Sequence, residues 1–308
     1  MYIKKTDGFL SSPQDLTQTF KNDFNLSVSN NEVLKMYQNK TIQRHDLLIA
    51  EFLLTSVYTT PEQVQKHLAN NGIVLSLEDI QIRLDKLVQY RILNKFFMTD
   101  EEVGKEDFPV DALVVYCLDL GGNYLLQSYS MKNSFDWKTG YNLKCSGLVL
   151  KALFCNEFRL KAAEVLTTNL NYFRYQPRFS HGKTIIVPTL DLGIKDSTVS
   201  KFIIANVFTE QDTLDTFDQV IKTELLLSSN AYKKYFGVQP IHIIIADNDY
   251  TAQEIAIRIQ ETKIADITRY TTEDRIRNKQ LSELGAFLKF IPEEEVFKPI
   301  IAGMFRPQ

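Results

Sequence analysis

Apolar residues recur at helical spacing in three consecutive stretches of the first half of the chain. These are TIQRHDLLIAEFLLTSVY, PEQVQKHLANNG and SLEDIQIRLDKLVQYRIL, all between residues 41 and 93. Thr60 and Ser76 precede the second and third stretches, where a hydroxyl can cap a helix, and Pro61 suits the first helical position. The pattern predicts three successive helices.

Two strand-like segments, NKFFM and DALVVYCLDL, follow these helices and flank the polar stretch EEVGKEDFP. Three helices followed by a two-stranded ribbon are typical of a winged helix-turn-helix, so we expect such a domain over residues 41–130. Residues 1–40 are polar with weak periodicity, which predicts a loosely ordered polar arm.

The second half of the chain alternates between helix and strand patterns. GLVLKALFCNEFRLKAAEVLTTNLNYF reads as one long helix or two consecutive helices. TIIVPTLDLGI and KFIIANVF read as strands, residues 214–236 as a helix and IHIIIADND as a buried strand. This order predicts an α/β domain over residues 145–308, and hence a two-domain α+β protein. Leu225, Leu226 and Leu227 indicate either a homodimer face or a helix buried on two sides.

Composition narrows the class of protein. Apolar residues make up 44% of the 308, charged residues 24%, and no apolar run reaches the ~20 residues of a membrane span. Cys117, Cys145 and Cys155 lack metal-ligand or paired spacing, and no glycine-rich phosphate loop or HExxH motif is present. We therefore expect a cytoplasmic protein with no membrane contact, no metal and no cofactor.

Charge is unevenly distributed along the chain. Residues 41–130 hold seven Lys and Arg against thirteen Asp and Glu, a net charge of −6. Residues 131–190 hold nine against three, a net charge of +6. A polyanion is expected to prefer the second of these segments.

Three stretches resemble the plasmid replication-relaxation family of mobile elements in Gram-positive bacteria. They are YCLDLGGNYLL, LKALFCNEFRLKAAE, and the series TLDLGI, KFIIANVF and IHIIIAD. The resemblance covers residues 41–250. It implies a winged helix joined to an α/β domain resembling a degenerate PD-(D/E)xK nuclease core, and a role in plasmid replication or conjugative transfer.

The chemistry of such a nuclease is incomplete in this sequence. Magnesium-dependent cleavage needs at least two converging carboxylates and a cation such as lysine. The second core strand has Asn206 where the family often has an acid, and Phe208 where a lysine is expected. If the protein were a nuclease, the catalytic carboxylates would be Asp191 with Glu157 or Glu164. The pattern favours a nuclease scaffold without its activity.

Two segments are candidates for contacting DNA. The third helix of a winged domain usually enters the major groove, and its outward side chains are predicted to include Gln81, Lys86 and Gln89, with Arg83 at the margin. Glu78 and Asp85 on the same helix would repel phosphates. The second segment, NYFRYQPRFSHGK, alternates Arg174, Arg178 and Lys183 with aromatic rings, as in surfaces that pair cations with phosphates and rings with bases.

These observations predict a non-catalytic protein that binds double-stranded DNA and acts with replication or transfer proteins. One alternative is a transcriptional regulator or protein–protein adaptor, in which the acidic winged helix binds protein and the α/β domain dimerises. A magnesium-dependent nuclease is the third reading.

Overall fold

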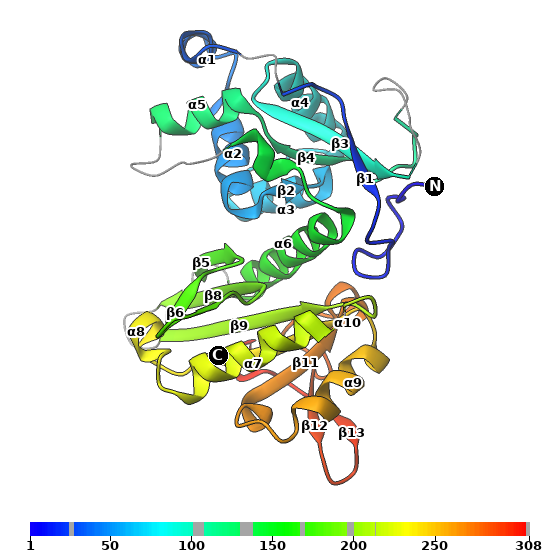
Figure 1. Cartoon of the computed structure of the whole chain (residues 1–308). Coiled ribbons are helices and arrows are strands. Elements are labelled where there is room, and N and C mark those ends of the chain that lie inside the picture. Colours follow the sequence, from blue (N-terminus) through cyan, green and yellow to red (C-terminus); the bar gives the residue numbers. More distant parts are fainter. Residues whose placement is uncertain are drawn as a thin grey trace. The chain divides into compact units, whose positions relative to one another are not determined.

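The computed structural model describes residues 1–24, 28–100, 108–129, 138–166, 170–195, 200–212 and 214–305. The chain has a mixed α+β structure (Figure 1). It divides into two compact units, unit 1 over Met1–Asn156 and unit 2 over Glu157–Gln308. The predicted division between residues 130 and 145 therefore lies too early, because the first half of helix α6 (Ser146–Leu166) belongs to unit 1.

Unit 1 combines helices with one antiparallel sheet. Its helices are α1 (Asn30–Gln38), α2 (Arg44–Ser56), α3 (Pro61–Asn70), α4 (Leu77–Gln89), α5 (Leu120–Tyr129) and the 3-10 turn at Thr139–Asn142. Its strands are β1 (Thr17–Phe20), β2 (Tyr58–Thr59), β3 (Leu93–Thr99) and β4 (Val115–Leu118), in the order β1-β3-β4-β2. Most of the predicted polar turn EEVGKEDFP lies outside the described residues.

The three helices that the sequence predicts are confirmed as α2, α3 and α4. The expected caps of α3 and α4 are present: the Thr60 side chain accepts from the N–H of Gln63 (3.4 Å), and that of Ser76 from Asp79 (3.1 Å). The inward faces of these helices form the core of unit 1, through buried residues that include Ile49, Leu53, Val64, Leu68, Ile80, Leu84 and Leu87.

The glycine pair at the start of α5 permits a close approach of two main-chain segments. A Cβ at Gly121 or Gly122 would collide with the carbonyl oxygen of Arg91 or Ile92, respectively. The N–H of Gly121 donates to the Arg91 carbonyl (2.9 Å). This contact explains why two glycines follow β4.

The prediction of a loosely ordered arm over residues 1–40 is wrong. The segment contains β1, which pairs with β3, and α1, which has a complete capping box at Ser29. Ile3, Leu10 and Leu16 are buried. Apolar residues in this segment are few and irregularly spaced, so no periodic pattern in the sequence predicts that they are buried.

Unit 2 is built on a seven-stranded sheet with the order β13-β12-β11-β10-β9-β8-β5. Strands β5, β8 and β9 are antiparallel neighbours, while β9, β10 and β11 are parallel. The sheet strands are β5 (Leu170–Tyr175), β8 (Leu190–Lys195), β9 (Ser200–Phe208), β10 (Ile241–Ala246), β11 (Thr268–Thr272), β12 (Phe287–Ile291) and β13 (Val296–Ile300). Strands β6 (Phe179–His181) and β7 (Thr184–Ile186) form a separate hairpin.

Helices cover both faces of this sheet. Besides the C-terminal half of α6, the helices of unit 2 are α7 (Leu214–Ser228), α8 (Lys233–Phe236), α9 (Asp249–Ile259) and α10 (Glu273–Asn278), with 3-10 turns at Ala265–Ile267 and Gly303–Phe305. On one face, Ile204, Ile244 and Tyr270 pack with residues of α7 and α9. Leu226 and Leu227 are buried in this core, so burial accounts for two of the three consecutive leucines.

The C-terminal half of α6 lies on the opposite face. Arg159 lies over the ring of Phe173 (5.0 Å), and Phe158 packs against Phe305, which stacks on Phe287. Among the described residues, no helix has the length and apolar character needed to cross a membrane.

Candidate functional site

Asp191, the acid expected to ligate a metal in a nuclease, is held by an arginine of the neighbouring strand. In the register of β5 and β8, Arg174 lies directly opposite Asp191. The guanidinium donates Nε to Oδ1 (3.0 Å) and Nη2 to Oδ2, a bidentate pair. The Asp191 side chain is fully buried, whereas that of Arg174 is 50% exposed.

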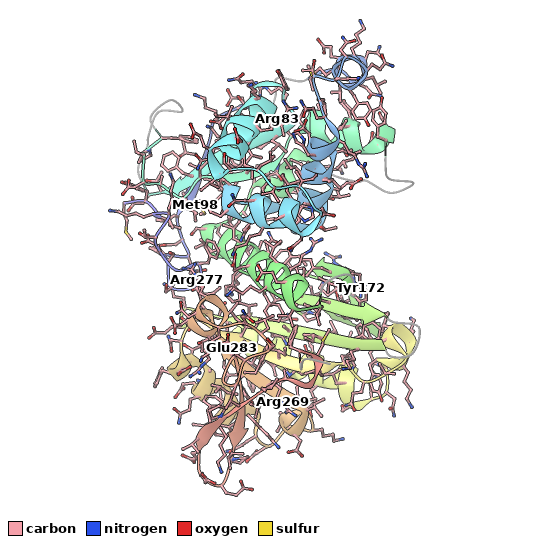
Figure 2. All side chains as sticks on the ribbon, turned by 180° about the vertical axis from the view of Figure 1, so that it is seen from behind. Arg83, Met98, Tyr172, Arg269, Arg277 and Glu283 are labelled. Atoms are coloured by element: carbon pink, nitrogen blue, oxygen red, sulfur yellow. The ribbon has the colours of Figure 1, made fainter. Side chains whose placement is uncertain are left out.

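Aromatic rings complete the surroundings of this pair. The Arg174 guanidinium lies over the rings of Tyr172 (5.2 Å) and Phe179 (5.5 Å); Figure 2 labels Tyr172 on its strand. Burial raises the pKa of Asp191, and the hydrogen bonds from Arg174 oppose this rise. The same hydrogen bonds raise the pKa of Arg174. Arg174 is therefore the internal counter-ion of a buried carboxylate.

Asn206 belongs to a buried polar ladder that crosses three parallel strands and one helix. Its Nδ2 donates to Thr223 Oγ1 of α7 (3.2 Å) and lies 3.1 Å from His242 Nε2 of β10. His242 Nδ1 lies 2.9 Å from Thr268 Oγ1 of β11, whose hydroxyl donates to the carbonyl of Ile264 (2.7 Å). All four polar side chains are buried.

The direction of these hydrogen bonds requires an amide at position 206. Because the Thr268 hydroxyl donates to Ile264, it accepts from His242, which places the imidazole proton on Nδ1 and leaves Nε2 as an acceptor. Thr223 likewise donates its proton to the carbonyl of Gln219 (2.7 Å) and accepts from Asn206. Burial lowers the pKa of His242 to about 3, so the ring is neutral at pH 7. Both N–H groups of the Asn206 amide therefore meet acceptors.

Replacing Asn206 by aspartate is expected to destabilise the protein by about 2 kcal/mol at pH 7, because a carboxylate would face two acceptors instead of donating to them. The buried carboxyl would have a raised pKa, so the deficit should shrink as the pH falls and the group binds a proton. Urea unfolding of both proteins at pH 5 and pH 8 measures this. A deficit that is absent, or that grows on acidification, would contradict the assigned hydrogen bonds.

The other carboxylates of the nuclease reading do not join Asp191. Glu157 and Glu164 lie on α6, which packs on the face of the sheet that carries Phe173. Arg174 and its partner Asp191 point to the other face, because successive side chains of a strand alternate. Among the described residues, no group of three or more Asp, Glu, His or Cys side chains could hold a metal ion.

A second feature of unit 2 is a group of exposed cations around the β6–β7 hairpin and α8. The Tyr235 hydroxyl accepts from the N–H of Ser180 (2.8 Å) and donates to its carbonyl (3.1 Å), and the Tyr235 ring contacts Phe179 (4.9 Å). This contact ties α8 to the hairpin (Figure 1). The four exposed cations that flank it, called here the basic surface, are Arg178, Lys183, Lys233 and Lys234.

The basic surface has no acidic neighbour in its own segments. Residues 165–190 and 225–246 contain no Asp or Glu. Within the part of the chain that the structure describes, none of its four cations forms an ion pair with a carboxylate. Lys234 lies over the Tyr235 ring (5.2 Å). These cations are therefore available to an anion from solution.

The phenylalanine rings between these cations are buried in the core and do not form an exposed surface. Phe173 and Phe179 are buried, and Phe179 packs on Phe236 (5.4 Å). The expectation that these rings stack on bases is therefore wrong for both phenylalanines. Sequence reasoning also missed Lys233 and Lys234, although AYKKYFG repeats the mixture of cations and rings seen at residues 171–183.

On α4, the structure separates Arg83 from the other predicted contacts. Its guanidinium donates Nε to Asp46 Oδ1 (2.7 Å) and Nη2 to Asp46 Oδ2 and to the carbonyl of Thr41 (2.8 Å), so Arg83 faces inward. Lys86 and Gln89 are exposed, and Gln81 is partly exposed. Asp85 binds Lys95 (2.7 Å) and Tyr116 (3.0 Å).

Comparison with known proteins finds one weak structural similarity. No family model matches the chain, and no curated protein matches it. Among solved structures, one of the restriction endonuclease FokI bound to DNA is similar at a TM-score of 0.26 and 9% sequence identity. The match covers 82% of this chain, which spans 45% of the FokI chain. None of these comparisons assigns the chain to a family.

Proposed function

We propose that this protein is a non-catalytic DNA-binding protein that holds the phosphate backbone of duplex DNA on the basic surface of unit 2. The observation that carries this proposal is the grouping of Arg178, Lys183, Lys233 and Lys234 around the Ser180–Tyr235 contact, without an acidic neighbour in either segment. Exposed cations of this kind neutralise phosphates and release counterions from DNA. The buried phenylalanines favour a duplex over a single strand, whose bases would need exposed rings.

The proposal that the protein is not a nuclease rests on the hydrogen bonds of Asp191 and Asn206. Asp191 is bound to Arg174, and Asn206 uses both of its N–H groups within the buried ladder. A metal ion would have to displace a bidentate arginine from a buried carboxylate, and would find a neutral amide turned toward the core. The antiparallel β5-β8-β9, helix α7 and parallel β10 support a degenerate PD-(D/E)xK nuclease core.

Unit 1 is proposed to be a winged helix-turn-helix that also contacts DNA. Its support is the chain order α2, β2, α3, α4, β3 and β4, with β2 pairing antiparallel to β4 and β4 to β3. Gln81, Lys86 and Gln89 then remain available to DNA, and Arg83 does not. Together with the sequence resemblance, this supports a role in plasmid replication or transfer.

The experiment is a titration of a labelled duplex, followed by fluorescence anisotropy at several salt concentrations with Mg²⁺ present. If all four cations meet phosphates, their replacement by glutamine should lower the slope of log affinity against log salt by about 3.6, since each phosphate contributes about 0.9. K233Q/K234Q should weaken binding more than K222Q/K298Q. The second pair removes the same charge, but Lys222 and Lys298 lie beside their own carboxylates, Asp218 and Glu294.

Equal effects of the two double variants would reject the basic surface as the contact. Cleavage of the duplex that is lost in Asp191→Ala would reject the non-catalytic assignment.

A second candidate function is a protein–protein adaptor. Ile82 is 50% exposed on α4, and Val74 in the preceding turn is 86% exposed, next to the exposed acids Glu78 and Asp79. An apolar and acidic face suits a protein surface better than a phosphate backbone. Absence of DNA binding even at low salt would favour this function.

A further inference from the structure

Unit 2 contains a cavity at the amino ends of the parallel strands β10 and β11, with a volume of about 330 Å³. Its lining residues precede or begin these two strands, or follow β13. Pockets that bind small molecules start at about 300 Å³, so the cavity is large enough for one. Neither the basic surface nor the Arg174–Asp191 pair contributes a lining residue. The cavity is therefore a separate candidate site.

Arg269, labelled in Figure 2, is the cation among the lining residues. Its Nη1 donates to the carbonyls of Asp266 (2.8 Å) and Thr268 (2.9 Å), which holds the guanidinium in place. Nε and Nη2 have no hydrogen bond to a described residue. The side chain is partly exposed, and neither atom is among the fully buried polar atoms without a partner, so a solute can reach both.

The unused edge of this guanidinium is the edge that binds carboxylates elsewhere in the chain. Arg83, Arg174 and Arg275 each donate Nε and Nη2 to the two oxygens of one aspartate. This fork matches the planar geometry of a carboxylate. No carboxylate of a described residue forms an ion pair with Arg269. The empty edge thus has the geometry to bind a carboxylate from solution.

The electrostatics around Arg269 also favour an anion. Burial lowers the pKa of Arg269 by more than the nearby acid Asp266 raises it, so the guanidinium has lost water without gaining a full counter-ion. None of the described lining residues is Asp or Glu. Lys201 adds a second cation, since its Nζ lies 3.5 Å from the carbonyl oxygen of Gly303, a lining residue.

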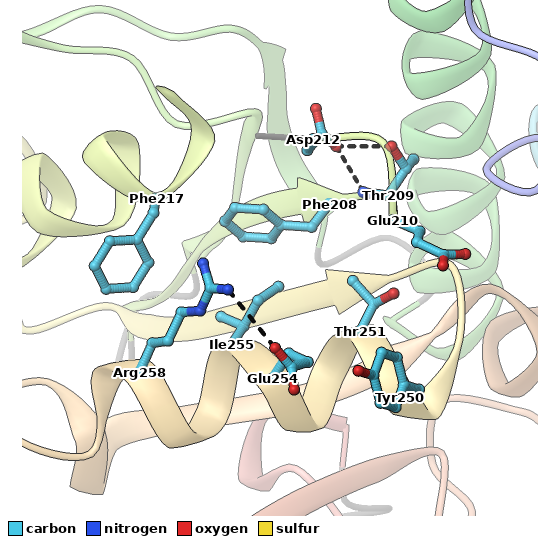
Figure 3. A pocket seen from close by; sticks show the side chains of 10 residues that line it. All are labelled: Phe208, Thr209, Glu210, Asp212, Phe217, Tyr250, Thr251, Glu254, Ile255 and Arg258. Atoms are coloured by element: carbon cyan, nitrogen blue, oxygen red, sulfur yellow. Dashed lines mark hydrogen bonds and ion pairs between the residues drawn. The ribbon is translucent and has the colours of Figure 1, made fainter. Parts of the chain in front are cut away.

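A second pocket of unit 2 has the opposite character. Figure 3 shows it at the carboxyl ends of β9 and β10, where Glu210, Asp212 and Glu254 are among the lining residues. Its arginine, Arg258, is already paired with Glu254 (3.6 Å). Of the two pockets, the one that contains Arg269 is therefore the one suited to an anion.

The remaining walls of the Arg269 cavity are apolar. Pro240, Ile241, Ile267 and Ala302 contribute to them. Ile241 lies on the same face of the sheet as Arg269, because Arg269 pairs with Ile243 and side chains alternate along a strand. A cavity of ~150 Å³ accommodates a benzene ring, so this larger one has room for a ring and a carboxylate.

We propose that this cavity binds a small organic monocarboxylate that carries one apolar ring. The carboxylate accepts hydrogen bonds from Nε and Nη2 of Arg269, and the ring packs against Ile241 and Ile267. Lys201 attracts the anion without contacting the ring. This inference goes beyond DNA binding and does not depend on it, because the basic surface contributes no lining residue.

The test is a titration of the full-length protein with 3-phenylpropionate, followed by NMR. The Nε–H signal of Arg269 and the methyl signals of Ile241 and Ile267 should shift saturably at millimolar ligand. The methyl signals of Ile255, in the acidic pocket of Figure 3, should not shift. 3-Phenylpropanamide, which keeps the ring and loses the charge, and acetate, which lacks the ring, should each bind at least about tenfold more weakly.

Variants then test the contacts. Arg269→Lys keeps the charge but loses the fork, and Gln239→Glu places a competing carboxylate at an exposed lining position. Each should weaken 3-phenylpropionate about tenfold. Gln260→Glu, the same change at an exposed position outside the cavity, should leave binding unaltered, as should K233Q/K234Q on the basic surface. Thermal melts confirm that each variant is folded.

Four results would overturn the proposal: no saturable shift in the wild-type protein, equal binding of the amide, tighter binding of inorganic phosphate, or unaltered binding by both cavity variants. Loss of DNA binding in K233Q/K234Q with normal 3-phenylpropionate binding would show that the two sites act separately.

Discussion

Arg174→Ala is expected to lower the free energy of unfolding by about 3 kcal/mol at pH 7, the effect of leaving a buried carboxylate without its partner. Asp191 has a fully buried side chain and accepts two hydrogen bonds from this one guanidinium. Without Arg174 the pKa of Asp191 rises further above its ordinary value. The loss should therefore be largest at neutral pH and shrink on acidification, as Asp191 binds a proton.

Urea unfolding of four proteins measures this effect: wild type, Arg174→Ala, Asp191→Asn and the double variant. The double variant should be more stable than Arg174→Ala, because it removes the uncompensated charge along with the arginine. Arg178→Ala is the matched control, since Arg178 is exposed and has no carboxylate partner among the residues that the structure describes; it should change stability by less than about 0.5 kcal/mol. A stable Arg174→Ala protein with weakened DNA binding would instead make Arg174 a DNA contact.

Arg83→Ala is expected to destabilise unit 1 by a similar or larger amount, about 4 kcal/mol. Its partner Asp46 is fully buried, and Arg83 is itself only 16% exposed. Asp46 also accepts from the N–H of Gln43 (2.6 Å), so the same carboxylate fixes the start of α2. Loss of Arg83 should therefore loosen both the α2–α4 contact and the first turn of α2.

The control for this prediction lies one turn further along α4. Lys86→Ala removes an exposed cation from the same helix and should leave stability within about 0.5 kcal/mol of wild type. Arg83→Lys should recover only part of the loss, because an ammonium cannot reproduce the bidentate pair. Thermal unfolding followed by circular dichroism reports both. If Arg83→Ala keeps its stability and loses DNA affinity, the inward assignment of Arg83 is incorrect.

Local patterns in the sequence identified the helices and strands well, because their signals lie within each segment. The caps at Thr60 and Ser76 and the buried run of β10 are examples. The roles of Arg174 and Arg83 depend instead on partners 17 and 37 residues away, across a strand register and a helix contact. Nothing near either arginine in the sequence distinguishes an internal counter-ion from a surface cation.

The basic surface also depends on a contact between residues that lie far apart in the sequence. Arg178 and Lys183 were predicted as contacts, but Lys233 and Lys234 join them only because Tyr235 reaches Ser180, 55 residues earlier. The prediction of a loosely ordered polar arm was wrong for a related reason. Strand β1 is stabilised by pairing with β3 and not by a periodic apolar pattern of its own.

The polar ladder through Asn206, His242 and Thr268 also determines how the parallel strands can align. His242 lies opposite Thr268 in the β10–β11 pair, and Asn206 opposite Ile244 in the β9–β10 pair. A slip of β10 by one residue would turn His242 to the other face of the sheet, leaving the amide and the hydroxyl buried without partners. Each buried polar group that loses its partner costs about 1–3 kcal/mol, so misaligned sheets are strongly disfavoured during folding. The isoleucine runs of these strands alone would not select one register.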